Sequence, residues 1–500
     1  MIRAIHCVVD QPSQEKLPYK QDSVAQAVAS ARPIIERICA EVWDLAEVSL
    51  QEVKSTLVHQ RELKEEGFTI VSTGTSGVPT AFVAEWTQGA GGPVIGFLAE
   101  YDALPGLGNA PVPRQEARAD GITSGHGCGH NLLGAGLTGA AIAVKRVMEA
   151  QGIAGTVRAY GCAAEETEGA KVFMARDGLF NDLDACFHWH PAPIAAVINV
   201  RMSATNAIKV GFRGRTAHAA LEPWKGRSAL HALELAAHGF NLMREHLEPT
   251  ARLHYVFEVA GVAPNVVTDY TRIWLTMRGL DRQRVVANTE WIKQIAAGAA
   301  MATQTEAEVH VRFGLHDLLP NTPLAERMQQ HLEAVGIPAW SDEEQAFAKA
   351  CQQAMGLPEV GMMTKIWPLQ PEPTVGGSSD VAEASWNTPT MGLTMPTLPL
   401  DIPLHTWAVT ACGGMSIGLQ GTLAATQVLA RTALDVLTDP ELRRAAREDL
   451  ARRTAGHPYI SPLPPEQTRP STLPDWLLGD GTTEAVANIT QGAKSKRGAG

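Results

Sequence analysis

The residues best suited to chemistry lie in the segment Gly-His-Gly-Cys-Gly-His-Asn at positions 125–131. Cys128 and His130 are two residues apart in this glycine-rich loop, so a thiolate and an imidazole nitrogen can face one ion. The glycines let the backbone turn closely around such an ion. An incidental Cys-x-His in a glycine-rich turn would look the same, so a metal site needs support from elsewhere in the chain.

Three further segments carry metal-binding residue types at loop positions. Glu165 and Glu166 follow a predicted strand in the run Ala-Glu-Glu-Thr-Glu, where close carboxylates are costly unless a positive charge lies nearby. If this run is considered alone, a solvated acidic loop is the alternative to a metal-binding segment. His188 and His190 follow another apolar run, and His405 lies far downstream after a proline-rich loop. Together the clusters offer enough ligands for two metal ions with an open coordination position.

Two other interpretations compete with a metal site. Gly-Ala-Gly-Leu-Thr-Gly at 134–139 matches a dinucleotide-binding pattern, but the strand that must precede this pattern is missing. Close packing of a helix on a sheet explains the small residues better. Cys128 with a nearby histidine could also be a thiol nucleophile. Against this, the neighbouring glutamates are expected to raise the pKa of the thiol unless a metal ion cancels their charge.

The elements that must position these residues indicate an α/β fold. Residues 94–99 and 156–162 are predicted as buried strands, and residues 131–150 as the helix between them. Strand, loop, helix and strand at this spacing predict a parallel or mixed sheet covered by helices. In such sheets ligands gather beyond the carboxyl ends of the strands, where the candidate residues would lie.

We expect a small domain inserted into a larger one. Within 205–312 the order strand, helix, strand, strand, helix, strand predicts a two-layer α+β unit. The catalytic domain is then assigned to 31–204 and 313–460. Residues 1–30 are polar and poorly patterned, and residues 461–500 are rich in Pro, Gly and Thr, which predicts a surface extension and a mobile tail.

Composition limits the classes of function. The chain has 500 residues, 45% of them apolar and 19% charged, which suits about two or three globular units. A formal charge of −11 argues against a nucleic-acid or anionic-membrane partner, and no stretch approaches the ~20 apolar residues of a membrane span. Seven scattered cysteines form no disulfide framework, so we expect a protein of the reducing cytoplasm.

A series of motifs follows in order between about residues 30 and 460: AEYDALPGL, GHGCGHNLLG, YGCAAEETEG, WHPAP, GRTAHAA with KGRSAL, PNVV, SSDV and PLHTW. This ordered set resembles the M20 metallopeptidase and amidohydrolase family, most closely its subgroup of p-aminobenzoyl-glutamate hydrolase subunits. The resemblance implies a metal-bearing catalytic domain with a mixed, largely parallel sheet and helices on both faces. It also implies that the inserted domain is a lid that serves dimerisation.

The resemblance implies a role for each matching residue. Glu165 would be the general base that takes a proton from the attacking water. In the lid, His218 would steady the developing oxyanion in the neighbouring subunit's site, and Asn265 and Arg278 would hold a substrate carboxylate. A plain sheet-surface charge is the alternative for Arg278. The implied ligands of two divalent ions, Zn or Mn, are Cys128, His130, Glu166, His190 and His405.

The implied activity is metal-dependent hydrolysis of the amide bond of a small N-acyl or N-aroyl amino acid, with the enzyme working as a homodimer. A non-catalytic or regulatory subunit and a dipeptidase of the same family are the alternatives. A heteromer with a related subunit is included because the subgroup's namesake is called a subunit. Two positions are notable: Asn131 stands where commoner members have Asp, and other branches of the family would select His188 in place of His190.

Overall fold

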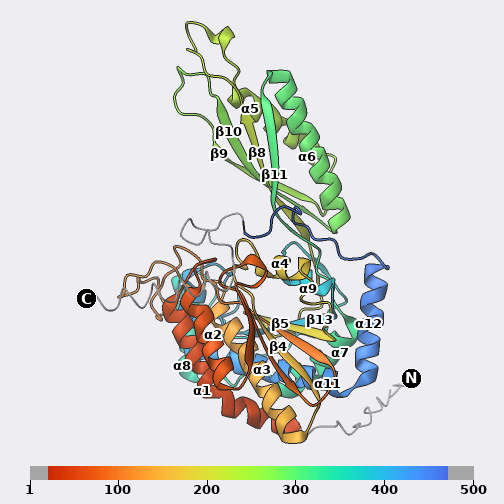
Figure 1. Cartoon of the computed structure of the whole chain (residues 1–500). Coiled ribbons are helices and arrows are strands. Elements are labelled where there is room, and N and C mark those ends of the chain that lie inside the picture. Colours follow the sequence, from red (N-terminus) through yellow and green to blue (C-terminus); the bar gives the residue numbers. More distant parts are fainter. Residues whose placement is uncertain (1–20, 471–500) are drawn as a thin grey trace, which may run out of the picture.

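The computed structural model describes residues 21–470, which form a large α/β domain and a slender domain that projects from it (Figure 1). The projecting domain, called the lid below, contains its elements in the predicted order of strand, helix, strand, strand, helix, strand. They are β8 (Ala204–Arg213), α5 (Ala229–Arg244), β9 (Arg252–Val259), β10 (Tyr270–Gly279), α6 (Arg282–Thr303) and β11 (Glu306–Leu315).

A mixed seven-stranded sheet forms the centre of the large domain. Its strands are β1 (Thr69–Thr73), β2 (Phe82–Gln88), β3 (Val94–Ala99), β4 (Gly155–Gly161), β5 (Ala185–Ala192), β6 (Ala196–Val197) and β13 (Thr390–Pro396). The spatial order is β1-β2-β4-β3-β5-β13-β6. The central strands β4, β3, β5 and β13 run parallel to one another, and the outer pairings are antiparallel. A separate short parallel pair joins β7 (Arg201–Met202) to β12 (Thr374–Val375).

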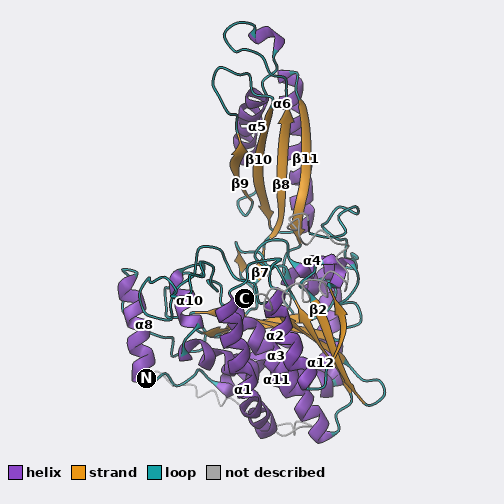
Figure 2. Cartoon of the chain, turned by 60° about the vertical axis from the view of Figure 1, so that its left-hand side comes forward, coloured by secondary structure: helices purple, strands orange, loops and turns teal. Residues whose placement is uncertain are grey.

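Helices cover both faces of this sheet, as the fold-class prediction requires (Figures 1 and 2). On one face α3 (His130–Gln151) and α11 (Ser416–Thr438) pack against the strands, with α1 (Gln21–Leu45) outside them. On the other lie α4 (Ala170–Arg176) and α9 (Val381–Ser385). The remaining helices are α2 (Val53–Glu65), α7 (Thr322–Val335), α8 (Asp342–Ala354), α10 (Trp407–Gly413) and α12 (Pro440–Thr454).

Small residues bring α3 close to the sheet. A Cβ added at Gly136 would lie 2.7 Å from Nε1 of Trp189 on β5. This confirms the packing interpretation of the glycines at 134–139, which lie inside α3 rather than in a phosphate-binding turn. Within residues 21–470 no helix combines the length and the apolar character needed to cross a membrane.

Two predicted boundaries are wrong in part. Helix α1 begins at Gln21, and Val24 and Val28 are buried in the core, so residues 21–30 belong to the large domain. The apolar stripe of this helix starts earlier than the polar composition suggested. Residues 461–470 of the predicted tail also pack on the protein, because Leu463 is buried in the core. The rest of the predicted extension and tail, residues 1–20 and 471–500, lies outside the described residues.

The lid is a two-layer unit with its own core. Its four-stranded antiparallel sheet has the order β11-β8-β10-β9, and α5 and α6 cover one face. Phe212, Phe240, Leu275 and Ile292 are buried between sheet and helices. The loops that join β8 to α5 and β9 to β10 form the tip of the lid, at the end away from the large domain (Figure 2). The short helix η2 (Pro223–Lys225) lies in the first of these loops.

Candidate metal centre and active site

The predicted metal ligands meet at one edge of the central sheet. Because β3, β4, β5 and β13 are parallel, their carboxyl ends share this edge. Glu166 follows β4, His190 lies near the end of β5, and His405 lies in the loop after β13. Cys128 and His130 lie where the long loop after β3 enters α3. The topology therefore gathers ligands that are far apart in the sequence.

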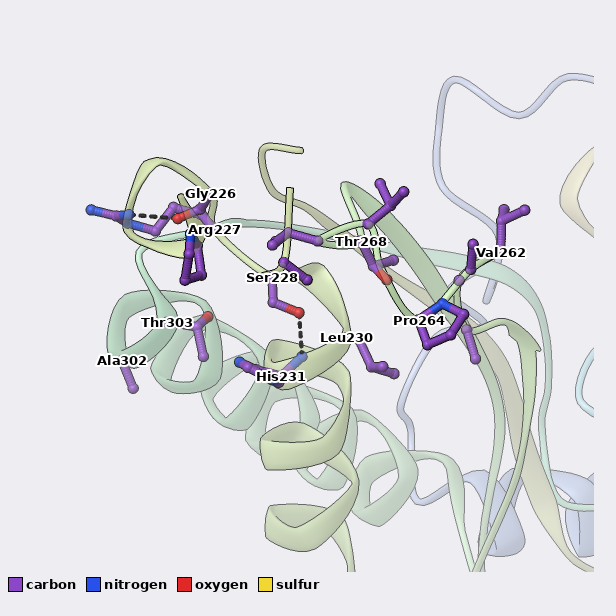
Figure 3. Close-up of a pocket in the computed structure, with 17 residues that line it drawn as sticks. Gly226, Arg227, Ser228, Leu230, His231, Val262, Pro264, Thr268, Ala302 and Thr303 are labelled. Carbon is purple, nitrogen blue, oxygen red and sulfur yellow. Dashed lines mark hydrogen bonds between the residues drawn. The ribbon is translucent and has the colours of Figure 1, made fainter. Parts of the chain in front are cut away.

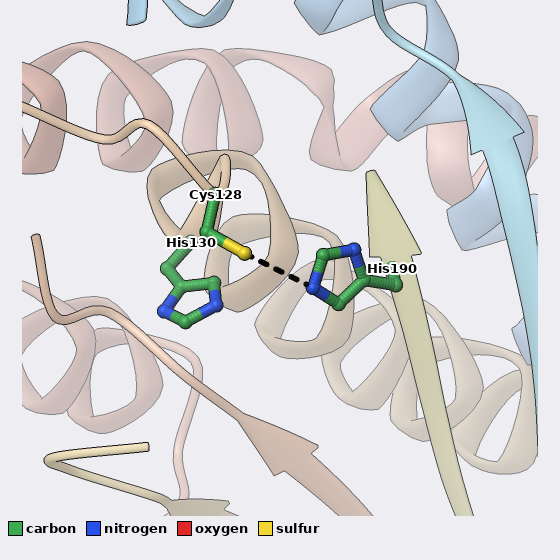
Figure 4. A group of neighbouring side chains, drawn as sticks. All are labelled: Cys128, His130 and His190. Atoms are coloured by element: carbon green, nitrogen blue, oxygen red, sulfur yellow. Dashed lines mark hydrogen bonds between the residues drawn. The ribbon is translucent and has the colours of Figure 1, made fainter. Parts of the chain in front are cut away.

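Two groups of potential ligand atoms share the Cys128 thiol. Cys128, His130 and His190 form one group, and Cys128, Glu166 and His405 form the other; within each group the ligand atoms lie within 4.8 Å of one another. Sγ of Cys128 is 3.4 Å from Nε2 of His190, with the His130 ring beside this pair (Figure 4). Nε2 of His405 is 3.3 Å from Oε1 of Glu166.

The donor atoms fit the predicted pair of divalent ions. Nε2 of His130 and Oε1 of Glu166 are buried and make no hydrogen bond, although Oε2 of Glu100 lies 3.4 Å from the first atom and Nε2 of His405 lies 3.3 Å from the second. Such atoms are costly in a folded protein unless something binds them, and both belong to the donor groups. Thiolate, imidazole and carboxylate together are ligands of divalent transition metals.

The charges around Cys128 favour a thiolate. Burial raises the pKa of the thiol, but the charges of His190 and His130 outweigh burial and lower the pKa to about 6. The expectation that neighbouring glutamates raise this pKa is therefore wrong, because two imidazoles contact the sulfur. A thiolate is also the nucleophilic form. The surrounding histidine and glutamate donors favour a metal ligand over a nucleophile.

Two backbone conformations hold the ligand loops in place. Gly129, between Cys128 and His130, has a φ of 77°, and a Cβ there would lie 2.8 Å from Cβ of Pro191. His405 has a φ of 61°, which costs a non-glycine residue about 1–3 kcal/mol. Its N–H donates to the carbonyl of Gly127 at 2.7 Å, so the glycine-rich loop supports this conformation.

Asp102 orients two of the ligands, a role that we did not predict from the sequence. Its Oδ1 lies 2.8 Å from Nδ1 of His130, and its Oδ2 accepts from the N–H of Glu166 at 3.0 Å and from the Ser49 hydroxyl at 2.7 Å. The contact with Nδ1 leaves Nε2 of His130 facing the other ligands. Carboxylates in this position fix the orientation of a ligand histidine. The sequence did contain a sign of this role, because Asp102 follows a predicted buried strand within the motif AEYDALPGL.

Glu165 belongs to neither group that shares Cys128, but it forms a third metal-capable group with Glu100 and His130. Burial and the charges of Glu100 and Asp380 raise the pKa of Glu165 well above its usual value. Lys171 acts in the opposite direction; its fully buried ammonium lies 2.7 Å from Oε1 of Glu100 and 2.5 Å from Oδ1 of Asp380. Lys171 had no signal in the sequence, because its partners come from other loops.

The structure brings His190, not His188, to the candidate metal centre. His188 belongs to none of the metal-capable groups within residues 21–470. Its ring packs on β13, where a Cβ at Gly392 would lie 2.5 Å from its Nε2. Burial lowers the pKa of His188 to about 3, so it is a neutral packing residue.

Asn131 supports the fold rather than a ligand. Its Nδ2 donates to the carbonyl of Cys39 at 3.2 Å and to the carbonyl of Gly413 at 3.1 Å. An aspartate could not donate to either carbonyl, so the amide ties α1 to α10 behind the metal centre.

Within one chain, Arg278 lies far from the other two predicted lid residues. His218 and Asn265 lie in the loops of the lid tip, where the N–H of Ala219 donates to the carbonyl of Asn265 at 3.0 Å. A pocket of about 730 Å³ lies beside these loops and contains none of the predicted metal ligands (Figure 3). Arg278 lies at the other end of β10, where its Nη1 donates to Oγ of Ser378 at 2.6 Å.

Comparison with known proteins agrees with this geometry. Residues 96–391 match the model of peptidase family M20/M25/M40. The chain belongs to this family. A p-aminobenzoyl-glutamate hydrolase subunit of Escherichia coli K12 is 35% identical over 477 residues, which cover 90% of this chain and 98% of that protein. A mouse Xaa-Arg dipeptidase is 28% identical over 384 residues, covering 75% of this chain and 78% of that protein.

Two solved structures share the fold. An aminobenzoyl-glutamate utilization protein from Klebsiella pneumoniae has a TM-score of 0.55 at 18% identity, covering 82% of this chain and 98% of that one. A dinuclear metal-binding M20 peptidase from Bacillus subtilis has a TM-score of 0.54 at 20% identity, covering 81% of this chain and 99% of that one. The predictions of family, fold class and a hydrolase are confirmed.

Proposed function

We propose that this M20 hydrolase cleaves the amide bond of an N-acyl or N-aroyl amino acid, using two divalent metal ions and Glu165 as general base. The observation that carries the proposal is the pair of donor groups that share Cys128, with Glu165 adjacent in sequence to Glu166 and close to His130 of the other group. When bound, the ions supply a Lewis acid that polarises the amide carbonyl and lowers the pKa of water.

The protein's own residues would divide the remaining work. Cys128 belongs to both donor groups and would serve both ions; His130 and His190 complete one group, and Glu166 and His405 the other. Glu165 would accept a proton from the attacking water and return it to the nitrogen of the leaving amine. Its raised pKa supports this role, because a higher pKa makes the carboxylate a stronger acceptor for the proton of the attacking water.

The names of relatives support the substrate class. Besides the p-aminobenzoyl-glutamate hydrolase subunit, they include a hippurate hydrolase of Campylobacter jejuni at 25% identity and an N-acetyl-L-cysteine deacetylase of Bacillus subtilis at 29%. Each of these names describes removal of an acyl or aroyl group from an amino acid. A soft thiolate favours Zn and carboxylates also suit Mn, so metal analysis of the purified protein must decide between them.

The test is hydrolysis by the purified single chain. The panel contains p-aminobenzoyl-glutamate, benzoyl-, indoleacetyl- and acetyl-amino acids, and a dipeptide with C-terminal arginine. Chelation should abolish release of the amine, and added Zn²⁺ or Mn²⁺ should restore it. Undiminished activity in metal-free protein would contradict the proposal, and cleavage of the dipeptide alone would favour a dipeptidase. Activity that needs a second, related chain would favour a role as one part of a larger hydrolase, which the name of the Escherichia coli relative suggests.

Arg278 is suited to hold a substrate carboxylate. It is half-buried, and within residues 21–470 no carboxylate lies within ion-pair distance of it. Burial lowers its pKa, which indicates a cation without a counter-ion. An anionic substrate would supply the missing charge. Arg278→Met is therefore expected to raise KM for a carboxylate substrate far more than for its amide analogue.

We also propose that the enzyme is a dimer in which the lid tip of one subunit completes the site of the other. Nδ1 of His218 accepts from the N–H groups of Ala220 and Leu221, at 3.2 Å each, which leaves Nε2 to donate to an oxyanion. Asn265 lies on the same tip and would contribute from there. The free edge strand β9 carries exposed Val256 and Phe257, which supports pairing between two lids.

The shared site has a direct test. His218→Ala and Glu165→Gln should each inactivate the enzyme, the first by about 10²–10³-fold in kcat. After subunit exchange a hybrid dimer contains one site with both residues intact, so a mixture should recover part of the activity. No recovery after demonstrated exchange, or a fully active monomer, would contradict the shared site.

A further inference from the structure

The lid contacts the turn that carries Glu165 and Glu166. This turn covers residues 163–169, between β4 and α4. Nη2 of Arg312, on lid strand β11, donates to Oε1 of Glu168 at 2.7 Å. The side chains are only 18% and 4% exposed, so the ion pair is largely shielded from water. Removing one partner of a shielded pair costs more than the loss of an exposed surface pair.

An irregularity in β11 directs Arg312 toward this turn. The pairing with β8 shifts between Val311, opposite Ile208, and Phe313, opposite Ala207. Arg312 is therefore the extra residue of a β-bulge, a feature that redirects a side chain out of the regular alternation. The next residue also reaches the turn, because a Cβ at Gly169 would lie 3.2 Å from Cε2 of Phe313.

The bulge is held from a second direction by residues near the end of the described chain. Nε2 of Gln467 donates to the carbonyl of Arg312 at 3.1 Å. Nη1 of Arg176, on α4, donates to the carbonyl of Gln467 at 2.6 Å. Helix α4 begins at Ala170, directly after the turn. The turn, the bulge in β11, the segment around Gln467 and α4 therefore each contact the next, and α4 is joined to the turn by the chain itself.

The large domain anchors the earlier part of the same turn. Oε1 of Glu52 accepts from the N–H of Ala164 at 2.7 Å, and Ala164 has a φ of 56°. Oδ2 of Asp102 accepts from the N–H of Glu166 at 3.0 Å. These contacts hold the turn up to Glu166. The part that follows is closed by backbone hydrogen bonds to the Ala164 carbonyl, and the Arg312–Glu168 pair ties it to the lid.

We propose that Arg312 is a positioning residue: acting through Glu168, it holds the turn that presents Glu165 and Glu166, and it makes the geometry of the metal centre depend on the position of the lid. The inference rests on the proposed function for the roles of these two glutamates. Separation of the lid from the turn would release the segment that follows Glu166.

Arg312→Met, Glu168→Gln and the double variant test the proposal, with Arg213→Met as the control. Arg213 lies on the same lid sheet and makes an exposed pair with Glu308, at 3.4 Å. Each test variant should bind Zn²⁺ and Mn²⁺ about tenfold more weakly in competition with a chelator. Each should also speed hydrogen exchange of the amides at 163–169 and lower kcat more than it changes KM. The double variant should be no worse than the worse single variant, because each single substitution already breaks the shared Arg312–Glu168 pair.

The control variant is expected to match the unaltered protein in every measurement. Arg312→Lys keeps the charge but not the forked geometry, so it should fold normally and give an intermediate metal affinity. A lower melting temperature in Arg312→Met with unchanged metal affinity and unchanged exchange at 163–169 would overturn the proposal. If the unaltered protein hydrolyses nothing on the panel, the proposed function fails. The exchange comparison, which needs neither substrate nor metal, would still decide the positioning role.

Discussion

Replacing Asp102 by Asn should weaken metal binding while leaving the fold intact. The carboxylate has partners on both oxygens: His130 on Oδ1 at 2.8 Å, and Glu166 N–H and Ser49 on Oδ2 at 3.0 and 2.7 Å. Asparagine has the same shape, but one oxygen becomes an NH₂ group that cannot accept. Either the His130 side or the Glu166 side must therefore lose its acceptor.

The expected magnitude follows from these contacts. Losing the outer partner of a ligand histidine typically costs 10–100-fold in metal affinity, or about 1.4–2.7 kcal/mol. Burial raises the pKa of Asp102, but the hydrogen bond with His130 and the charge of His130 outweigh it and bring the pKa to about 2. The carboxylate is therefore ionised at pH 7, and the substitution also removes a full negative charge beside two ligands. We expect a loss near the upper end, about 100-fold.

The assay is competition with a chromogenic chelator for Zn²⁺ and Mn²⁺ at pH 7, with thermal unfolding measured in parallel. Ser49→Ala removes one hydrogen bond to Asp102, worth ~1 kcal/mol, and should weaken binding by no more than about fivefold. Asp182→Asn is the control. This carboxylate lies in the loop before β5, is 59% exposed, and forms an ion pair with Arg158 rather than contacting a candidate ligand. Metal affinity of Asp102→Asn within about twofold of the unaltered protein would refute the reasoning.

Three further predictions test other parts of the site and its surroundings. Glu165→Gln should retain its metal and lose about 10²–10⁴-fold in kcat; an equal loss of metal would mean that Glu165 and Glu166 exchange roles. Lys171→Met leaves two buried carboxylates without their cation, and urea unfolding should show a loss of about 3–5 kcal/mol. An unchanged unfolding midpoint would contradict that expectation. Burial lowers the pKa of His59 to about 3. Below about pH 6.5 this histidine therefore binds a proton in the unfolded chain and stays neutral in the folded one. The free energy of unfolding should decrease as the pH falls from 6.5 toward 3. His59→Asn should make this decline shallower, and an identical pH profile would show that His59 does not contribute.

Local pattern alone determined much of this protein. The strand predicted at 94–99 coincides with β3, and the helix predicted at 131–150 corresponds to α3 (His130–Gln151). Periodicity and breaker residues act over short distances, so the sequence reports them directly. The four clusters of potential ligands could be found for a related reason, since residue types with metal affinity followed predicted strands and parallel strands end at one edge of a sheet. The family resemblance then selected the five individual ligands within these clusters. The ordered motifs added the family and the role of the inserted domain as a lid.

Contacts between segments that are remote in the sequence could be known only from the tertiary structure. His188 and His190 lie on the same side of β5, so alternation could not separate them; the packing of His188 on Gly392 of β13 does. The pKa of Cys128 falls because β5 brings His190 to the sulfur, which no neighbour in the sequence reveals.

The supporting residues were hidden for the same reason. Asp102, Lys171 and Glu168 acquire their roles from partners on other elements, and the partner of Glu168 is Arg312 in the lid. Charge and hydrogen-bond energies depend on distances in space, and the sequence specifies those distances only through the completed fold.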